Sequence, residues 1–173
     1  MAGLLFLQSE DFNIQEGSKG PILCNNIRGI SLVLFYSTKC QHCQNLIPIF
    51  KRLPGQLGGV QFGMINVSTE TDVVRMSRGT ITEIKYVPLI LLFVSGKPFI
   101  RFDYQGKPTE TIIKNFVIGV VSNIQNKDIF HKGKKTQQRH HLDDNDIPLY
   151  TIGHPLKGFD EVSYLEFDEA YKK

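Results

Sequence analysis

Residues 31–43 decide the fold of this chain, and they read SLVLFYSTKCQHC. The run from Ser31 to Tyr36 is apolar and of strand length, as expected for a strand that is buried on both faces of a sheet. The stretch from Cys40 to Arg52 places apolar residues on one face, so its spacing predicts a helix. The sequence therefore predicts a strand that leads into a helix, with two cysteines at the junction.

Cys40 and Cys43 are three positions apart, so both sulfurs fall in the first turn of the predicted helix. Two thiols so placed can close a disulfide, and the helix dipole favours a thiolate on the first sulfur. A zinc site is the weaker interpretation, because zinc requires four ligands and Cys24 and His42 complete it poorly. A c-type haem would require a histidine where Gln44 stands. We expect a redox dithiol with no metal and no cofactor.

The composition is that of a globular protein with 173 residues, 41% of them hydrophobic and 21% charged. The net charge of +3 is too small to indicate nucleic-acid binding by itself. The apolar run from Val87 to Val94 has only strand length, so we expect no membrane span. Leu4 to Leu7 is too short for a secretory signal, and there are three cysteines. We therefore expect a reducing, cytoplasmic location, with Cys24 an inert core or loop residue.

Charge divides the sequence into three zones. Residues 1–126 carry twelve basic and eight acidic side chains and alternate strand-like with helix-like patterns. Residues 127–142 carry five basic and one acidic side chain, and we interpret them as a basic polar linker. Residues 143–173 carry three basic and eight acidic side chains but keep apolar and aromatic positions. We interpret this last zone as an acidic C-terminal extension that either packs on the domain or docks a partner.

The first zone predicts an α/β fold. Crossover helices between strands imply a parallel half of the sheet, and the hairpin signal Ser95-Gly96-Lys97-Pro98 implies an antiparallel half. Turn residues at 17–21 predict a loop, and a helix is optional between the first two strands. Thr109 is the expected N-cap of the last helix. We expect strands at 4–7, 31–36, 60–67, 86–94 and 99–104, and helices at 40–52, 71–77 and 109–124.

This order, with Cys-x-x-Cys at the second strand–helix junction, resembles the thioredoxin superfamily. The likeness covers about residues 2–126 and rests on residues 35–43, on Pro48 after the dithiol, on Val87-Pro88 before a strand, and on the hairpin and helix that follow. It implies a thioredoxin-like fold, a mixed central sheet flanked by helices. Some large cytoplasmic DNA viruses encode thioredoxin-like proteins with similar extensions, and that looser likeness implies packaging in a virion if the chain is viral.

The resemblance also implies a role for each site residue. Cys40 matches the exposed thiol that attacks a partner disulfide, and Cys43 matches the buried thiol that resolves the mixed disulfide. His42 matches the histidine that stabilises the thiolate in protein disulfide isomerases. Pro88 matches the family's cis-proline. Val87 would pair through its backbone with a substrate strand, and Gln41, beside Cys40, would also contact substrate.

Three positions depart from the family pattern. Leu34 stands where thioredoxins carry a buried acid that helps to deprotonate the resolving thiol. Lys39 replaces the tryptophan before the dithiol, and Met64 replaces a lysine on the next strand. The usual proton relay is therefore absent, and either exchange is slow or water or His42 takes the proton.

The expected function is thiol–disulfide exchange through Cys40 and Cys43. The expected partners are protein substrates with cysteines or disulfides and a redox protein that recycles the dithiol, without nucleic acid or membrane. A first alternative is a non-catalytic binding module with a thioredoxin-like fold. A second is a glutathione-linked, glutaredoxin-like reductase, although no Gly-Gly-Asp-like glutathione site follows the hairpin.

Overall fold

A computed structural model describes residues 3–103, 106–133 and 163–165 of the chain, and side chains through residue 126. Most elements lie close to the ranges that the sequence predicts. The helices are η1 (a 3-10 turn, Ser9–Asp11), α1 (Gln41–Lys51), α2 (Thr71–Ser77) and α3 (Glu110–Gly133). The strands are β1 (Leu4–Phe6), β2 (Phe12–Gly17), β3 (Gly20–Asn25), β4 (Ile30–Tyr36), β5 (Val60–Asn66), β6 (Leu89–Val94), β7 (Lys97–Asp103) and β8 (Ser163–Leu165).

The central sheet is mixed and has the strand order β1-β5-β4-β6-β7-β8. The strands β1, β5 and β4 run parallel, and β6 pairs antiparallel with β4 and with β7. β4 lies in the middle, with Leu32, Val33, Leu34 and Phe35 all fully buried. This is the buried central strand that the apolar run predicts, and the parallel and antiparallel halves meet along it.

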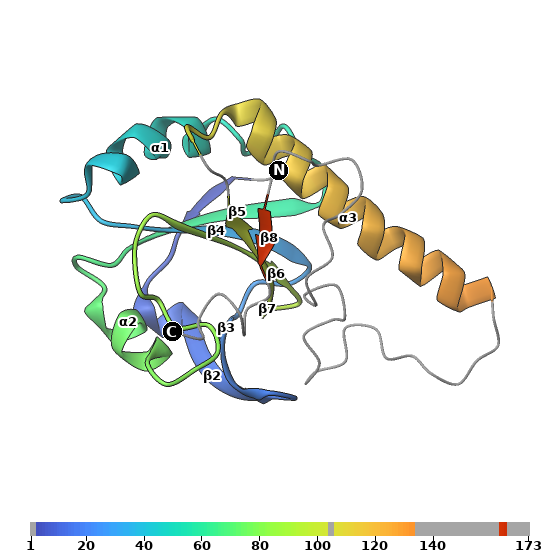
Figure 1. Ribbon diagram of the computed structural model, residues 1–173, viewed down its shortest axis with the longest axis horizontal. Helices are drawn as coiled ribbons and strands as arrows, with labels where there is room; N and C mark the ends of the chain where they lie inside the picture. Colours follow the sequence, from blue (N-terminus) through green and yellow to red (C-terminus); the bar gives the residue numbers. More distant parts are fainter. Residues whose placement is uncertain (1–2, 104–105, 134–162, 166–173) are drawn as a thin grey trace.

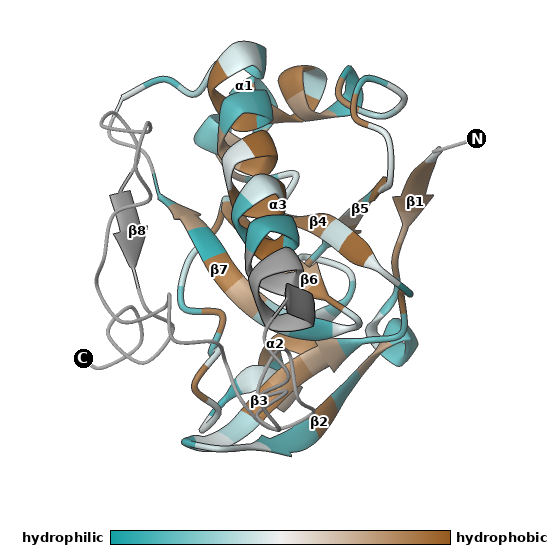
Figure 2. Ribbon diagram, turned by 90° about the vertical axis from the view of Figure 1, so that its right-hand side faces the viewer, coloured by the Kyte–Doolittle hydropathy of each residue, from teal (hydrophilic) through white to brown (hydrophobic). Residues whose placement is uncertain are grey.

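Each face of the sheet has its own core. Leu34, Phe50, Met64 and Phe116 belong to the core under α1 and α3, and Phe12, Leu23, Phe35 and Val73 to the core under β2, β3 and α2. Figure 1 shows α1 and α3 above the sheet, with α2 and the β2–β3 ribbon below it. In the turned view of Figure 2, α1 and α3 again cover one face. The result is a three-layer α/β fold with α1 placed over the carboxyl end of β4.

The segment between β1 and β4 differs from the sequence-based expectation. The optional helix is absent from this described segment apart from the short turn η1, and β2 and β3 form a two-stranded antiparallel sheet instead. Only Ser18 and Lys19 form the turn, because the glycines on either side of it already belong to the strands. Gly20 has φ +134, a conformation that glycine adopts without strain. The cluster of turn residues marked a tight hairpin, not a loop.

Two element boundaries also shift for local reasons. β6 begins at Leu89 rather than at Tyr86, because Pro88 has no N–H to donate to the ladder. The turn to β7 contains only Ser95 and Gly96, both with positive φ, so β7 already begins at Lys97. A Cβ at Gly96 would collide with the carbonyl oxygen of Asn25, so this turn requires glycine.

The last helix begins as predicted, since Thr109 Oγ accepts a hydrogen bond from the Ile112 N–H at 3.3 Å. α3 continues past residue 126 to Gly133, so the first residues of the predicted linker are helical. The rest of that linker lies outside the described residues. Of the extension 143–173, only Ser163–Leu165 is described, and it pairs antiparallel with β7 as strand β8.

Candidate active site

The dithiol lies where β4 leads into α1, and a short loop fixes this junction. The Ser37 carbonyl oxygen accepts a hydrogen bond from the Cys40 N–H at 3.2 Å, and Ser37 Oγ accepts one from the Lys39 N–H at 3.2 Å. The Gln44 side chain donates back to the Thr38 carbonyl oxygen at 2.7 Å. These contacts hold Cys40 as the N-cap residue of α1, in an extended conformation (φ −99, ψ 119).

The Cys40 sulfur takes the place of a capping oxygen. Cys40 Sγ accepts a hydrogen bond from the Cys43 N–H at 3.2 Å and lies 3.7 Å from the Val87 carbonyl oxygen. Cys40 is partly exposed, whereas Cys43 is fully buried, and both are free thiols. The fold thus places one sulfur where another molecule can reach it and the second directly behind the first.

Burial decides the protonation of the inner thiol. Desolvation, with a smaller contribution from the hydrogen bond to Cys40, raises the pKa of Cys43 to about 12. At neutral pH this thiol therefore keeps its proton until a base or a change of surroundings removes it. Cys43 is therefore a buried, protonated thiol, and its position is compatible with the resolving role that the sequence predicts.

The floor of the site is apolar, in agreement with the departures seen in the sequence. Leu34 and Met64 are partners in the parallel pairing of β4 with β5, and Ile90 faces Leu34 from β6. All three are buried and belong to the core under α1. The positions that hold an acid and a lysine in thioredoxins are thus neighbours here, and both are apolar. These three described neighbours therefore offer no counter-charge to an acid at position 34.

The loop before β6 closes the site on the other side. The Val87–Pro88 peptide bond is cis, and the Val87 carbonyl oxygen accepts from Cys40 as described above. Pro88 and the exposed His42 both line a cavity beside the dithiol. Gln41 is exposed at the start of α1 and is not among the residues that line this cavity. The structure therefore gathers all six predicted site residues around the dithiol, with Gln41 next to Cys40 and outside the cavity lining.

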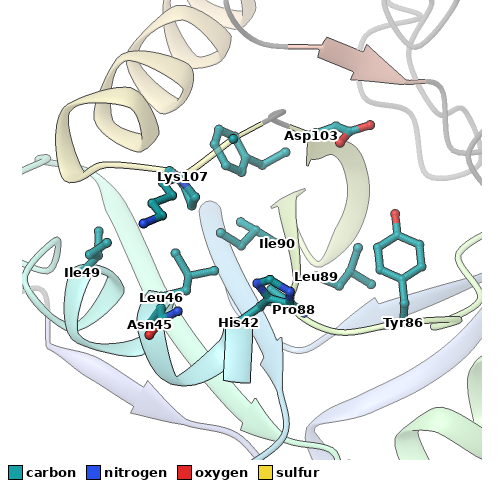
Figure 3. A pocket seen from close by; sticks show the side chains of 13 residues that line it. His42, Asn45, Leu46, Ile49, Tyr86, Pro88, Leu89, Ile90, Asp103 and Lys107 are labelled. Atoms are coloured by element: carbon teal, nitrogen blue, oxygen red, sulfur yellow. The ribbon is translucent and has the colours of Figure 1, made fainter. Parts of the chain in front are cut away.

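The cavity has a volume of about 730 Å³. One wall is α1, and the opposite wall is formed by the loop before β6, the end of β7 and the loop that leads into α3 (Figure 3). Sequence reasoning missed the residues of this opposite wall, among them Tyr86, Phe102, Asp103 and Lys107. Only Tyr86 carried a usable signal, an aromatic residue immediately before Val87-Pro88.

Cys24 stands apart from this site. It is fully buried in β3, and desolvation raises the pKa of its thiol to about 11, with Lys97 acting in the opposite direction. The described residues contain no cluster of three or more histidine, cysteine, aspartate or glutamate side chains that could hold a metal ion. Within the same residues, no helix is both long and apolar enough to cross a membrane.

Comparison with known proteins places the chain in a family. The family model described as Thioredoxin matches residues 23–118. Uncharacterized protein 196R of Invertebrate iridescent virus 6 is 34% identical over 178 residues, 99% of this chain and 95% of that protein. Uncharacterized protein 020R of Invertebrate iridescent virus 3 is 34% identical over 98% of this chain and 96% of that protein. Protein disulfide-isomerase like 2-2 of Arabidopsis thaliana is 30% identical over 66% of this chain and 27% of that protein. The chain belongs to the thioredoxin family, and its fold and paired cysteines support a redox role.

Proposed function

We propose that this protein is a thiol–disulfide oxidoreductase that exchanges disulfides with protein substrates through Cys40 and Cys43. One observation carries the proposal: the partly exposed Cys40 sulfur caps α1 and accepts the Cys43 N–H, with the buried Cys43 thiol behind it. A negative charge on that sulfur is favoured by the backbone N–H and by the amino end of the helix. Relatedness to a plant protein disulfide-isomerase like protein supports the same class of reaction.

The reaction proceeds in two balanced steps. The Cys40 thiolate attacks one sulfur of a substrate disulfide, so a Cys40–substrate bond forms, the substrate S–S bond breaks, and the leaving thiolate takes a proton. Cys43 then loses its proton and attacks Cys40 Sγ, which closes the Cys40–Cys43 disulfide and releases the second substrate thiol. The substrate gains two electrons and the dithiol loses two. Oxidation of a substrate is the reverse sequence, and the potential of the recycling partner, another dithiol or disulfide protein, sets the direction.

The test uses the full chain with three matched serine variants. Cys40→Ser should abolish reduction of insulin disulfides, because it removes the attacking sulfur. Cys43→Ser should accumulate a mixed disulfide between Cys40 and the substrate, detected as an added mass. Cys24→Ser, at a buried cysteine outside the site, should behave as the parent protein. Equal turnover by Cys40→Ser and the parent would refute the proposal.

A second candidate function is a non-catalytic binding module of the same fold. The apolar floor favours it, because Leu34 and Met64 provide no proton acceptor for a thiol whose pKa lies near 12. The variants above separate the two functions. Partners that a Cys43→Ser protein holds through a bond cleaved by reductant support exchange, whereas partners retained equally by Cys40→Ser support binding.

A further inference from the structure

The wall of the cavity that faces α1 contains the aromatic side chain of Tyr86, which contacts a buried arginine. Tyr86 lies immediately before Val87, whose carbonyl oxygen contacts the Cys40 sulfur. Its side chain lines the cavity, and the residue is 49% exposed. Figure 3 shows Tyr86 on the side of the cavity opposite Ile49 of α1, with His42 and Pro88 between them. A large ring is therefore exposed two residues from Pro88, next to the sulfur that a substrate must reach.

A buried arginine lies over this ring. The Arg101 guanidinium carbon lies 5.4 Å from the centre of the Tyr86 ring, within the range of a cation–π contact. Arg101 is only 5% exposed, and its charge is balanced by Asp103 through a hydrogen-bonded ion pair of 3.0 Å. Arg101 Nε is buried and has no hydrogen-bond acceptor among the described residues. Burying a guanidinium is costly, and here one of its contacts is the face of a half-exposed ring.

The remaining lining explains what would fit against Tyr86. Leu46 and Ile49 contribute apolar surface from α1, and Pro88 and Leu89 contribute it from the opposite wall. Charged groups lie at the side of β7 and the loop after it, where Asp103 and Lys107 line the cavity. A cavity of about 730 Å³ is larger than any one side chain, so it admits a side chain together with part of its backbone. Such a lining favours an apolar or aromatic group over a charged one.

We infer that Tyr86 is a specificity-determining residue, held in position by Arg101, that selects protein segments with a large apolar or aromatic side chain next to the target cysteine. The inference rests on the proposed exchange reaction and names its substrate class. When Cys40 bonds to a substrate sulfur beside Val87, the adjoining substrate residue lies at the mouth of the cavity and contacts the Tyr86 ring. Arg101 is a positioning residue, since it acts through the ring and does not line the cavity.

The test compares three disulfide substrates of the full-length protein. Two are peptides with one internal disulfide that differ only in the residue beside the target cysteine, phenylalanine or serine. The third is bis(2-hydroxyethyl) disulfide, which has no amino-acid residue beside its sulfurs for the Tyr86 ring to select. The variants are Tyr86→Ala, Tyr86→Phe, which keeps the ring, and Arg101→Met, which keeps an apolar chain but removes the charge.

Tyr86→Ala should raise KM for the phenylalanine peptide about tenfold, with kcat and the rate on the small disulfide unchanged. Tyr86→Phe should keep the parent KM, and Arg101→Met should give a smaller rise in KM for the same peptide. The serine peptide should respond little to any variant. An equal change of KM for both peptides, or none for either, would overturn the inference.

The small disulfide separates two kinds of failure. If the parent protein reduces none of the three substrates, the proposed exchange reaction itself fails. If it reduces all three and Tyr86→Ala does not distinguish the peptides, only the role of Tyr86 fails. Because the small disulfide also reports whether each variant still folds around its dithiol, a misfolded variant is recognised directly. Tyr86→Gln, which removes the ring but keeps a side chain of intermediate size, then replaces Tyr86→Ala in the comparison.

Discussion

At the scale of single residues, the site combines a reachable sulfur with a buried one above an apolar floor. Residues 31–43 were sufficient to predict the strand–helix junction and the position of both cysteines at it, because strand, helix and dithiol are all local patterns. The pairing of Leu34 with Met64 could not be predicted as a contact, since it depends on the register of two strands that are distant in sequence. That register shows why the two departures from the thioredoxin pattern occur together.

The apolar floor predicts a cost for restoring the missing acid alone. Leu34→Asp would bury a carboxylate with no cationic neighbour, which costs about 3 kcal/mol of unfolding free energy. Leu34→Asp/Met64→Lys supplies the partner across the strands and should recover part of that loss, measured by urea unfolding. The same double variant should resolve mixed disulfides faster at pH 7 than the parent. If the single variant is as stable as the double, the two positions do not act as a pair.

The raised pKa of Cys43 predicts how resolution depends on pH. The thiolate is the attacking species, and its fraction rises about tenfold per pH unit at any pH well below the pKa of about 12. Resolution of a preformed Cys40 mixed disulfide should therefore accelerate steadily between pH 7 and pH 10 in rapid-mixing experiments. A rate that stays constant between pH 7 and pH 10 would instead show that removal of the Cys43 proton does not limit resolution.

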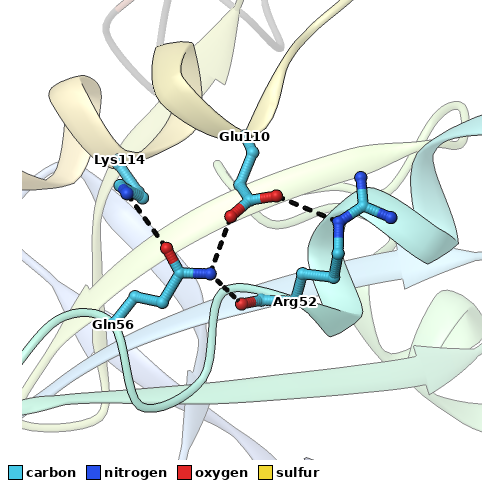
Figure 4. A network of polar contacts seen from close by, with 4 residues as sticks. All are labelled: Arg52, Gln56, Glu110 and Lys114. Carbon is cyan, nitrogen blue, oxygen red and sulfur yellow. Dashed lines mark hydrogen bonds and ion pairs between the residues drawn. The ribbon is translucent and has the colours of Figure 1, made fainter.

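At the scale of elements, a polar network ties the end of α1 to the start of α3 (Figure 4). Arg52 Nε and Gln56 Nε2 donate to the two carboxylate oxygens of Glu110 at 3.0 and 2.7 Å, and Lys114 donates to Gln56 at 2.9 Å. The network therefore holds the carboxyl end of α1, the helix that carries the dithiol at its amino end. Sequence patterns predicted both helices and the Thr109 cap, but not this contact, because its residues are more than fifty positions apart.

The network predicts a stability that depends on pH. Hydrogen bonds from Gln56 and, to a smaller extent, from Arg52 lower the pKa of Glu110 below its usual 4.5. A lowered pKa in the folded state stabilises the protein above pH 4.5, and this contribution disappears as pH falls through the lowered value. Glu110→Gln should therefore lower the unfolding free energy at pH 7 more than at pH 3, as measured by urea unfolding. An equal loss at both pH values would show that the charge of Glu110 does not contribute.

At the scale of the whole molecule, the C-terminal extension contributes the edge strand of the main sheet. Ser163–Leu165 pairs with residues 101–103 of β7, and two of those residues, Phe102 and Asp103, line the cavity beside the dithiol. The viral relatives match nearly the whole chain, so the resemblance includes the extension. Composition showed that this zone keeps apolar and aromatic positions, but a strand of three residues leaves no periodic pattern by which its place could be predicted.

The β7–β8 pairing predicts protection of β7 from amide hydrogen exchange. In an antiparallel ladder the N–H groups of successive residues point to opposite sides, so Tyr164→Pro or Leu165→Pro must remove a donor to β7. At least one of these variants should accelerate exchange at residues 101–103 while exchange in β4 stays slow. Unchanged exchange in both variants would mean that β8 does not shield this edge.

A redox titration of the full chain addresses the dithiol itself. The protein is equilibrated with mixtures of reduced and oxidised dithiothreitol, its free thiols are alkylated, and each cysteine is followed by peptide mass. We expect Cys40 and Cys43 to lose their alkyl labels together in one two-electron transition, while Cys24 remains a free thiol throughout. Cys40 and Cys43 that stay reduced under every oxidising mixture, or a disulfide that involves Cys24, would contradict a redox dithiol at the start of α1.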